Sequence, residues 1–292
     1  MMTINPLPPP SVPARGQVQR TFVAARVLAG FADPTHFEQL IAGEYLAKLS
    51  AEEKGKVLAA AQAAREFVAG LSPVSLDNVI IRPLNGPHVD AIQADPTFQH
   101  AMQGRPFAFA YVRPERLVAL QVHVEPRADK VPSGEPELLH FALPHKWEVP
   151  AEITLTPPLG PIHIVTSSPM LQGVRMELDA ARGRIIVSAP PHLNLVQVAE
   201  FQGRYYLRNG YHRVYDAVSS GIKEMPALVM PVINPAELEL GGTAFGAVYV
   251  AGRPRPPLVA DLATPAAMDI ELRERRYGVT ISLDVKPFSI GI

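Results

Sequence analysis

The chain of 292 residues contains no cysteine and only one tryptophan. The missing thiols exclude disulfides, thiolate metal sites and cysteine nucleophiles, and they are typical of a protein of the reducing cytoplasm. No stretch approaches the roughly 18 apolar residues of a membrane-spanning helix. The first 16 residues lack the apolar core of a secretory signal. We therefore expect a cytoplasmic protein that does not interact with a membrane.

The sequence also has almost no net charge, because 27 basic residues face 28 acidic ones. No field of the whole molecule would draw the protein onto DNA, so any contact with nucleic acid must be local. Hydrophobic residues make up 47% of the chain, which is enough for a sizeable core. The 31 prolines are spread along the sequence. This distribution predicts many short elements joined by firm turns, not a disordered chain.

Two segments are nevertheless crowded with proline. Residues 1–16 have proline at positions 6, 8, 9, 10 and 13, which predicts an extended arm, because proline cannot join a helix interior or a sheet ladder. This arm is either a loose tail or a strap that lies on a neighbouring subunit. The run Arg253–Pro257 is interpreted as a rigid connector, with a ligand for an aromatic groove as the alternative.

The region between the arm and residue 105 is predicted to be largely helical. From about residue 17 to residue 70 apolar side chains recur at a spacing of three to four, as around Phe37 and Leu40. Ser50 and Glu53 form a capping box for a second helix. We predict a helical hairpin at the start of a helical N-terminal region, 17–105.

Apolar runs in the rest of the chain predict strands. One covers residues 107–112 and is followed by a short helix that opens at Pro114. Residues 126–160 are rich in proline and polar residues and are interpreted as a long insertion of loops with one strand near 153–155. Further strands are predicted at 162–165, 174–178, 185–187, 195–201 and 204–208 and, within the tail 234–292, at 279–285.

The most informative stretch is Asn209, Gly210, Tyr211, His212 and Arg213, which stands between a predicted strand and a predicted helix. Gly210 at this junction would let the backbone approach a ligand closely. The N–H groups and the dipole at the start of a helix favour negative charge. His212 and Arg213 would be unfavourable in that first turn unless an anion joined them. The motif therefore predicts a site for a phosphate-sized anion, with His212 and Arg213 bonding to nearby carbonyl or carboxylate groups as the alternative.

The motif continues with Gly221 and the apolar run Met225–Val229. The order strand, Gly-x-[His/Arg]-Arg, helix, Gly and a strand led by an apolar–proline pair resembles the ParB/sulfiredoxin superfamily, most clearly over 183–231 and more weakly over 106–233. The resemblance implies an α+β core that binds a nucleotide or another phosphate ligand, such as CTP or ATP with Mg²⁺.

Three departures from the family limit what the resemblance implies about a reaction. Tyr211 stands where sulfiredoxin-like members have a catalytic cysteine and where partition CTPases have glutamate. Asn209 replaces the aspartate of a third type, and an amide neither acts as a base nor holds Mg²⁺ as strongly. No helix-turn-helix of the partition type follows the domain. These differences argue against chromosome partitioning.

Other residues near the motif are candidates for chemistry or binding. Catalytic candidates are His212, Glu125 and His123, since alternation along a strand places the last two on one face, either at the anion site or in solvent. Arg204 and Arg208, with Arg213, form either a basic patch for DNA or an ordinary exposed strand edge. No spacing of histidines and carboxylates predicts a metal site.

The predicted fold is α+β: a ParB/sulfiredoxin-like core over 106–233 with a long insertion, an N-terminal helical hairpin, and a C-terminal β-containing extension over 234–292. The predicted function is nucleotide or phosphate binding, by a regulator or a nucleotide-dependent enzyme. The alternatives are an inactive assembly protein that forms an oligomer and a DNA-binding protein. The sequence leaves open whether any reaction is catalysed.

Overall fold

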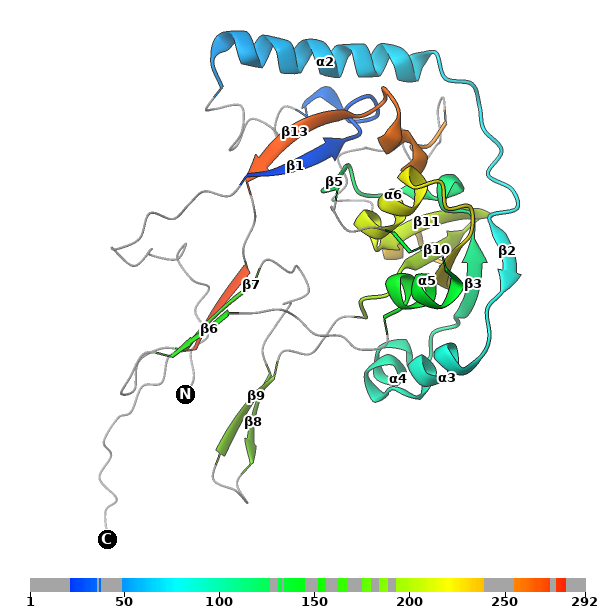
Figure 1. Cartoon of the computed structure of the whole chain (residues 1–292), viewed down its shortest axis with the longest axis vertical. Helices are drawn as coiled ribbons and strands as arrows, with labels where there is room; N and C mark the ends of the chain where they lie inside the picture. Colours follow the sequence, from blue (N-terminus) through cyan, green and yellow to red (C-terminus); the bar gives the residue numbers. More distant parts are fainter. Residues whose placement is uncertain are drawn as a thin grey trace. The chain divides into compact units, whose positions relative to one another are not determined.

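The computed structural model describes most of the chain, and the account that follows is confined to these residues: 22–35, 37, 49–126, 131–132, 134–144, 152–155, 162–166, 175–179, 184–188, 193–238, 255–273 and 277–281. The chain divides into two units, of which the larger comprises 22–146 and 193–273. The described elements combine helices with mostly antiparallel sheets (Figure 1), which is consistent with the predicted α+β class in general.

A six-stranded sheet with the order β2-β3-β12-β10-β11-β4 lies at the centre of the larger unit. Strands β10 (Gln197–Phe201) and β11 (Arg204–Asn209) form a hairpin whose two turn residues, Gln202 and Gly203, both have positive φ, as a tight hairpin requires. Helix α6 (Tyr211–Ser219) then leads to β12 (Met225–Pro231), which lies parallel to β10. The strands and the helix predicted around the motif are confirmed.

Central position explains the composition of β12. Its first six residues are all buried, and its neighbours are β10 on one side and β3 (Ala108–Val112) on the other. A strand that is covered on both faces has a continuous apolar sequence instead of an alternating one. The edges of the sheet are short: β2 (Ile80–Pro83) ends at a proline, and β4 (Val118–Ala119) has only two residues.

The helical prediction for residues 17–70 was wrong in its first part, because Phe22–Val27 is strand β1. Its residues pair along their whole length with β13 (Met268–Arg273), and β5 (His123–Val124) adds a third strand. Phenylalanine and valine favour such a half-buried ladder once a partner strand is present. The first predicted helix lies mostly outside the described residues.

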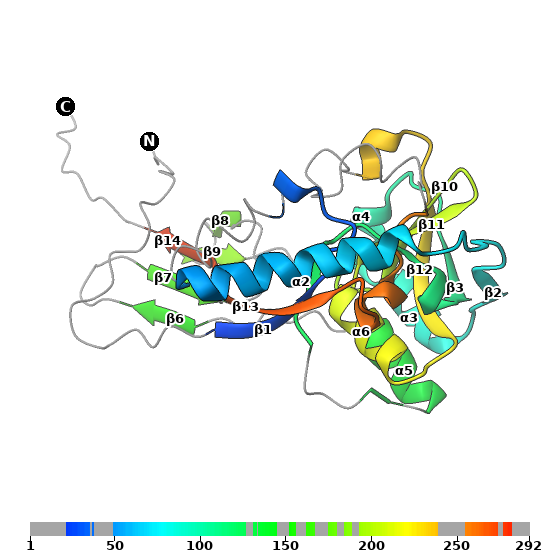
Figure 2. The same ribbon diagram turned by 90° about the horizontal axis from the view of Figure 1, so that it is seen from above.

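The second helix of the predicted hairpin is confirmed as α2 (Ala51–Ala69). The Ser50 side chain accepts from the Glu53 N–H, and the Glu53 carboxylate accepts from the Ser50 N–H at 2.8 Å, as in a capping box. The buried residues of α2 are Ala61, Ala64 and Val68. Figure 2 shows α2 alongside β13 and β1, the two strands whose pairing the sequence did not predict.

The predicted insertion over 126–160 contains a helix where loops were expected. Helix α5 (Glu135–Ala142) packs near β12, with Leu138 and Ala142 buried. Two further helices, α3 (Pro87–Ala94) and α4 (Pro96–Met102), precede β3 within the predicted helical region 17–105. Residues Pro114–Arg116 form the single 3₁₀ turn η2 instead of a longer helix, since Val118 already belongs to β4.

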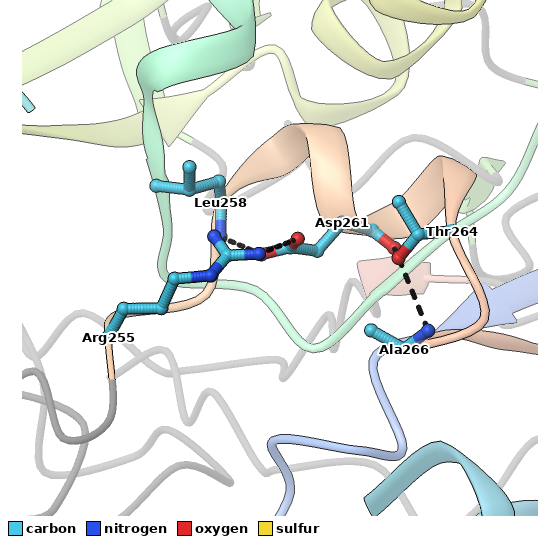
Figure 3. A network of polar contacts seen from close by, with 5 residues as sticks. All are labelled: Arg255, Leu258, Asp261, Thr264 and Ala266. Carbon is cyan, nitrogen blue, oxygen red and sulfur yellow. Dashed lines mark hydrogen bonds and ion pairs between the residues drawn. The ribbon is translucent and has the colours of Figure 1, made fainter. Parts of the chain in front are cut away.

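The proline run of the tail ends in a buried ion pair. The Arg255 guanidinium lies 2.6 Å from one oxygen of Asp261, and the other oxygen accepts from the Leu258 N–H at 2.8 Å (Figure 3). Burial raises the pKa of Asp261, while the bonds from Leu258 and Arg255 oppose that shift. Pro256 and Pro257 are buried, which supports the connector interpretation over a ligand for a partner's aromatic groove.

The smaller unit comprises 1–21, 147–192 and 274–292. Its described elements are a three-stranded sheet with the order β14-β7-β6 and the hairpin β8-β9. The strands predicted in this part of the sequence are confirmed at these positions: β6 (Glu152–Leu155), β7 (Ile162–Thr166), β8 (Arg175–Asp179), β9 (Arg184–Ser188) and β14 (Tyr277–Ile281). The predicted arm 1–16 lies outside the described residues. Among the described helices, none has the length and apolarity to cross a membrane.

Candidate functional site

The candidate site is the junction between β11 and α6. Gly210 occupies it in the left-handed conformation, with φ of 89°, and α6 begins without a hydrogen bond from a capping side chain. A Cβ atom at Gly210 would stand 2.8 Å from Val196 Cγ2 and 3.2 Å from Val196 Cα. The glycine is therefore needed both for the turn and for close contact with the chain that enters β10.

Tyr211 fixes the first turn of α6 to two neighbouring segments. Its hydroxyl donates to the Leu207 carbonyl and accepts from the Leu120 N–H at 3.0 Å. The side chain is buried, and this burial raises the pKa of Tyr211 although the main-chain hydrogen bonds oppose the shift. Tyr211 is therefore a neutral donor and acceptor that joins β11, α6 and the loop after β4.

His212 connects α6 to the residue that follows β5, the edge strand of the sheet β13-β1-β5. Its Nδ1 atom lies 3.0 Å from the main-chain nitrogen of Glu125 and 2.8 Å from the Glu125 carbonyl oxygen. Nδ1 accepts from the N–H in one tautomer and donates to the carbonyl in the other, so the main chain of Glu125 orients the ring in either state. The structure thus brings together two of the three catalytic candidates, through the main chain of Glu125.

The guanidinium of Arg213 is buried and hydrogen-bonded to other parts of the protein. Its Nη1 lies 3.0 Å from the Phe141 oxygen, 3.1 Å from the Ala142 oxygen and 3.0 Å from the Asn194 oxygen. Its Nη2 lies 3.0 Å from Oδ1 of Asn194. Only 8% of Arg213 is exposed, so it joins the end of α5 to the segment before β10, as the alternative interpretation of the motif expected. A direct phosphate contact of Arg213 stays a prediction that requires these bonds to be exchanged.

Asn209 is held by the same segment before β10. Its Nδ2 donates to the carbonyl of Leu193 at 3.2 Å and to that of Leu195 at 3.0 Å. An aspartate, as in one branch of the resembling family, has no donor to offer two carbonyls. These two hydrogen bonds explain why an amide, and not a carboxylate, stands at this position.

We expect Asn209→Asp to lower the free energy of unfolding by about 2 kcal/mol, because two hydrogen bonds are lost and a carboxylate then faces two carbonyl oxygens. Urea denaturation at neutral pH measures this loss. Asn234→Asp is the matched control: Oδ1 of Asn234 accepts from the Ala236 N–H, an interaction that aspartate retains. Equal stability of the two variants would contradict the role assigned to Asn209.

The other predicted site residues belong to strands β5 and β11. His123 is in β5, opposite Val27 of β1. Arg204 and Arg208 stand at the first and fifth positions of β11, which by alternation share one face of the strand. Arg213 does not extend this patch, because its side chain is buried. A basic surface for DNA would therefore have two of the three arginines that the sequence suggested.

Several partners of the motif were not found from the sequence. They are the carbonyl groups of Phe141, Ala142 and Leu207 and the side chain of Asn194. Main-chain partners leave no compositional signal, and only the fold brings them to the motif. In the part of the chain that the structure describes, no group of three or more histidine and acidic residues is arranged to hold a metal ion.

In comparisons with known proteins, no protein-family model, curated protein or solved structure matches the chain.

Proposed function

We propose that the protein binds a phosphate-bearing small molecule, a nucleotide in the first instance, at the N-terminus of α6. The observation that carries this proposal is that α6 begins at a left-handed glycine without a capping side chain. The first-turn N–H groups of any α-helix have no acceptor within the helix, and the helix dipole favours an anion there. A phosphate group meets both requirements.

Rigidity of the junction supports the proposal. Hydrogen bonds of Asn209, Tyr211, His212 and Arg213 fix the start of α6 to the segment before β10, the loop after β4, the residue after β5 and the end of α5. A site that is already ordered loses less conformational entropy when a ligand binds. The motif therefore holds the helix N-terminus in place for an anion, while most of its side chains bond to the rest of the protein.

The order β11, Gly210, α6 and β12 agrees with the order that the ParB/sulfiredoxin resemblance implies. On this basis we propose a fold of that type for the core, with CTP or ATP and Mg²⁺ as the ligand class. Phosphate oxygens and water would provide most of the Mg²⁺ ligands, as is common for this ion. His212 is the side chain best placed to contact the phosphate, because Glu125 orients its ring.

The test is thermal unfolding with ATP, ADP, CTP, GTP and inorganic pyrophosphate, each with Mg²⁺. At a ligand concentration of 100 times Kd, a bound ligand adds about 2.7 kcal/mol to stability. His212→Asn retains a polar atom for Glu125 but removes Nε2, and we expect a roughly tenfold weaker Kd, which corresponds to about 1.4 kcal/mol. His100→Asn, at an exposed position of α4, is the matched control. If no phosphate ligand shifts the transition, the proposal is refuted.

A further inference from the structure

Two acceptors of the Arg213 guanidinium come from the last turn of α5, and two come from Asn194. The carbonyl groups of Phe141 and Ala142 belong to the final residues of this helix. Such carbonyls have no partner within their own helix, and they carry the negative end of its dipole. α5 thus presents a partial negative charge to Arg213.

Arg213 itself belongs to the first turn of α6, the end at which the proposed phosphate binds. Side chains of an α-helix lean toward its N-terminus, so the Arg213 guanidinium extends toward this end. Both views show α5 and α6 as neighbours (Figures 1 and 2). The carbonyl groups at the C-terminus of α5 therefore bind the Arg213 guanidinium, which belongs to the N-terminal turn of α6.

From this arrangement we infer that the last turn of α5 is an internal competitor of the phosphate ligand. Phosphate binding transfers the Arg213 guanidinium from the carbonyls of Phe141 and Ala142 to the phosphate oxygens, and the last turn of α5 loosens. The inference rests on the proposed function and adds regulation to it. A charged phosphate forms stronger hydrogen bonds with a guanidinium than neutral carbonyls do, which favours the exchange.

The opposite end of α5 offers a way to change its docking without touching the site. Glu135, the first residue of α5, accepts from the Tyr111 hydroxyl at 2.5 Å and lies 3.3 Å from Nη2 of Arg82. The Arg82 guanidinium also stands 3.6 Å from the centre of the Tyr111 ring. Tyr111 is in β3 and Arg82 in β2, so this cluster fixes the N-terminus of α5 to the edge of the six-stranded sheet.

If α5 competes with phosphate, weaker docking of α5 must strengthen phosphate binding, since the two equilibria are linked. This sign is diagnostic. A substitution outside a binding site usually leaves affinity unchanged or lowers it, whereas this model requires a gain.

The experiment measures the Kd of the full-length protein for inorganic pyrophosphate by calorimetry. We expect Tyr111→Phe, which removes the hydroxyl bond to Glu135, to bind pyrophosphate about three to ten times more tightly, within the usual range of coupling between sites. Glu135→Ala, at a side chain that is 61% exposed, tests the same end of α5 with little risk to folding. Tyr205→Phe makes the matched chemical change on β11 and should leave Kd unchanged.

Hydrogen exchange provides a second readout in the wild-type protein. Amide exchange in the last turn of α5 should rise when pyrophosphate is added. Tighter binding by Tyr111→Phe and Glu135→Ala together with this rise would support competition. Wild-type binding with an unchanged Kd in both variants would overturn the competition and leave the proposed function standing. No pyrophosphate binding by any of the proteins would overturn the proposed function and this inference together.

Discussion

Replacing Arg213 by alanine is expected to lower the free energy of unfolding by about 3 kcal/mol, a large loss for one side chain. The guanidinium makes four hydrogen bonds inside the protein, and the acceptors of Phe141 and Asn194 lose a partner when it is removed. Urea denaturation followed by circular dichroism measures the change. Because α5 loses part of its C-terminal attachment, amide exchange should rise most at residues 138–143.

Arg105→Ala is the control for the loss of a positive charge. Arg105 follows α4 and is exposed, so its removal should change stability by no more than about 0.5 kcal/mol. Arg213→Lys separates charge from shape, since lysine keeps the charge but not the planar fork of donors. A stable Arg213→Ala protein would show that the bonds to α5 contribute little, and it would also remove the basis of the inferred competition.

Gly210→Ala alone is expected to lower the free energy of unfolding by about 3 kcal/mol. Part of the loss is the strain of a left-handed φ for alanine, and part is the new methyl group 2.8 Å from Val196 Cγ2. Val196 is fully buried at the entry to β10. Thermal or urea unfolding of the variant measures the sum of both effects.

Gly203→Ala isolates the first effect. Gly203 also has positive φ, 74°, but no atom lies within 4 Å of the position that its Cβ would take. We expect a loss of about 1 kcal/mol there, from the backbone alone. The difference between the two variants reports the contact with Val196. Equal losses would mean that the chain around Val196 moves aside readily and that the junction is less rigid than the proposed site requires.

Local sequence patterns predicted those elements whose signals lie within a few residues. The capping box of Ser50 and Glu53 correctly placed the start of α2, and alternating or continuous apolar runs located β10, β11 and β12. Strand β1 was missed because it depends on pairing with β13, whose residues are far away in the sequence. Its valines and alanines fit a helix as well as a strand until that partner is known. α5 was missed because prolines and charges dominate the composition around it.

The candidate site shows the same contrast between local signals, which the sequence reveals, and contacts between distant residues, which it does not. The sequence identified the five residues from Asn209 to Arg213, since a glycine between a strand and a helix is a local signal. It did not establish what each side chain does. The partners of Arg213 are about seventy residues away along the chain at Phe141 and Ala142, and they are main-chain carbonyls that any residue type would provide. Their proximity is a property of the fold.

Arg213 also joins the two points at which the chain leaves and re-enters the larger unit. Its acceptors lie before residue 147 and after residue 192, and the Val196 N–H donates to the Ala142 carbonyl at 2.9 Å across the same gap. The closure entropy of a loop with fixed ends grows slowly, by about 0.6 kcal/mol for each doubling of length. Evolution can therefore lengthen, shorten or exchange the segment between these points while the sheet and the helix junction keep their sequence.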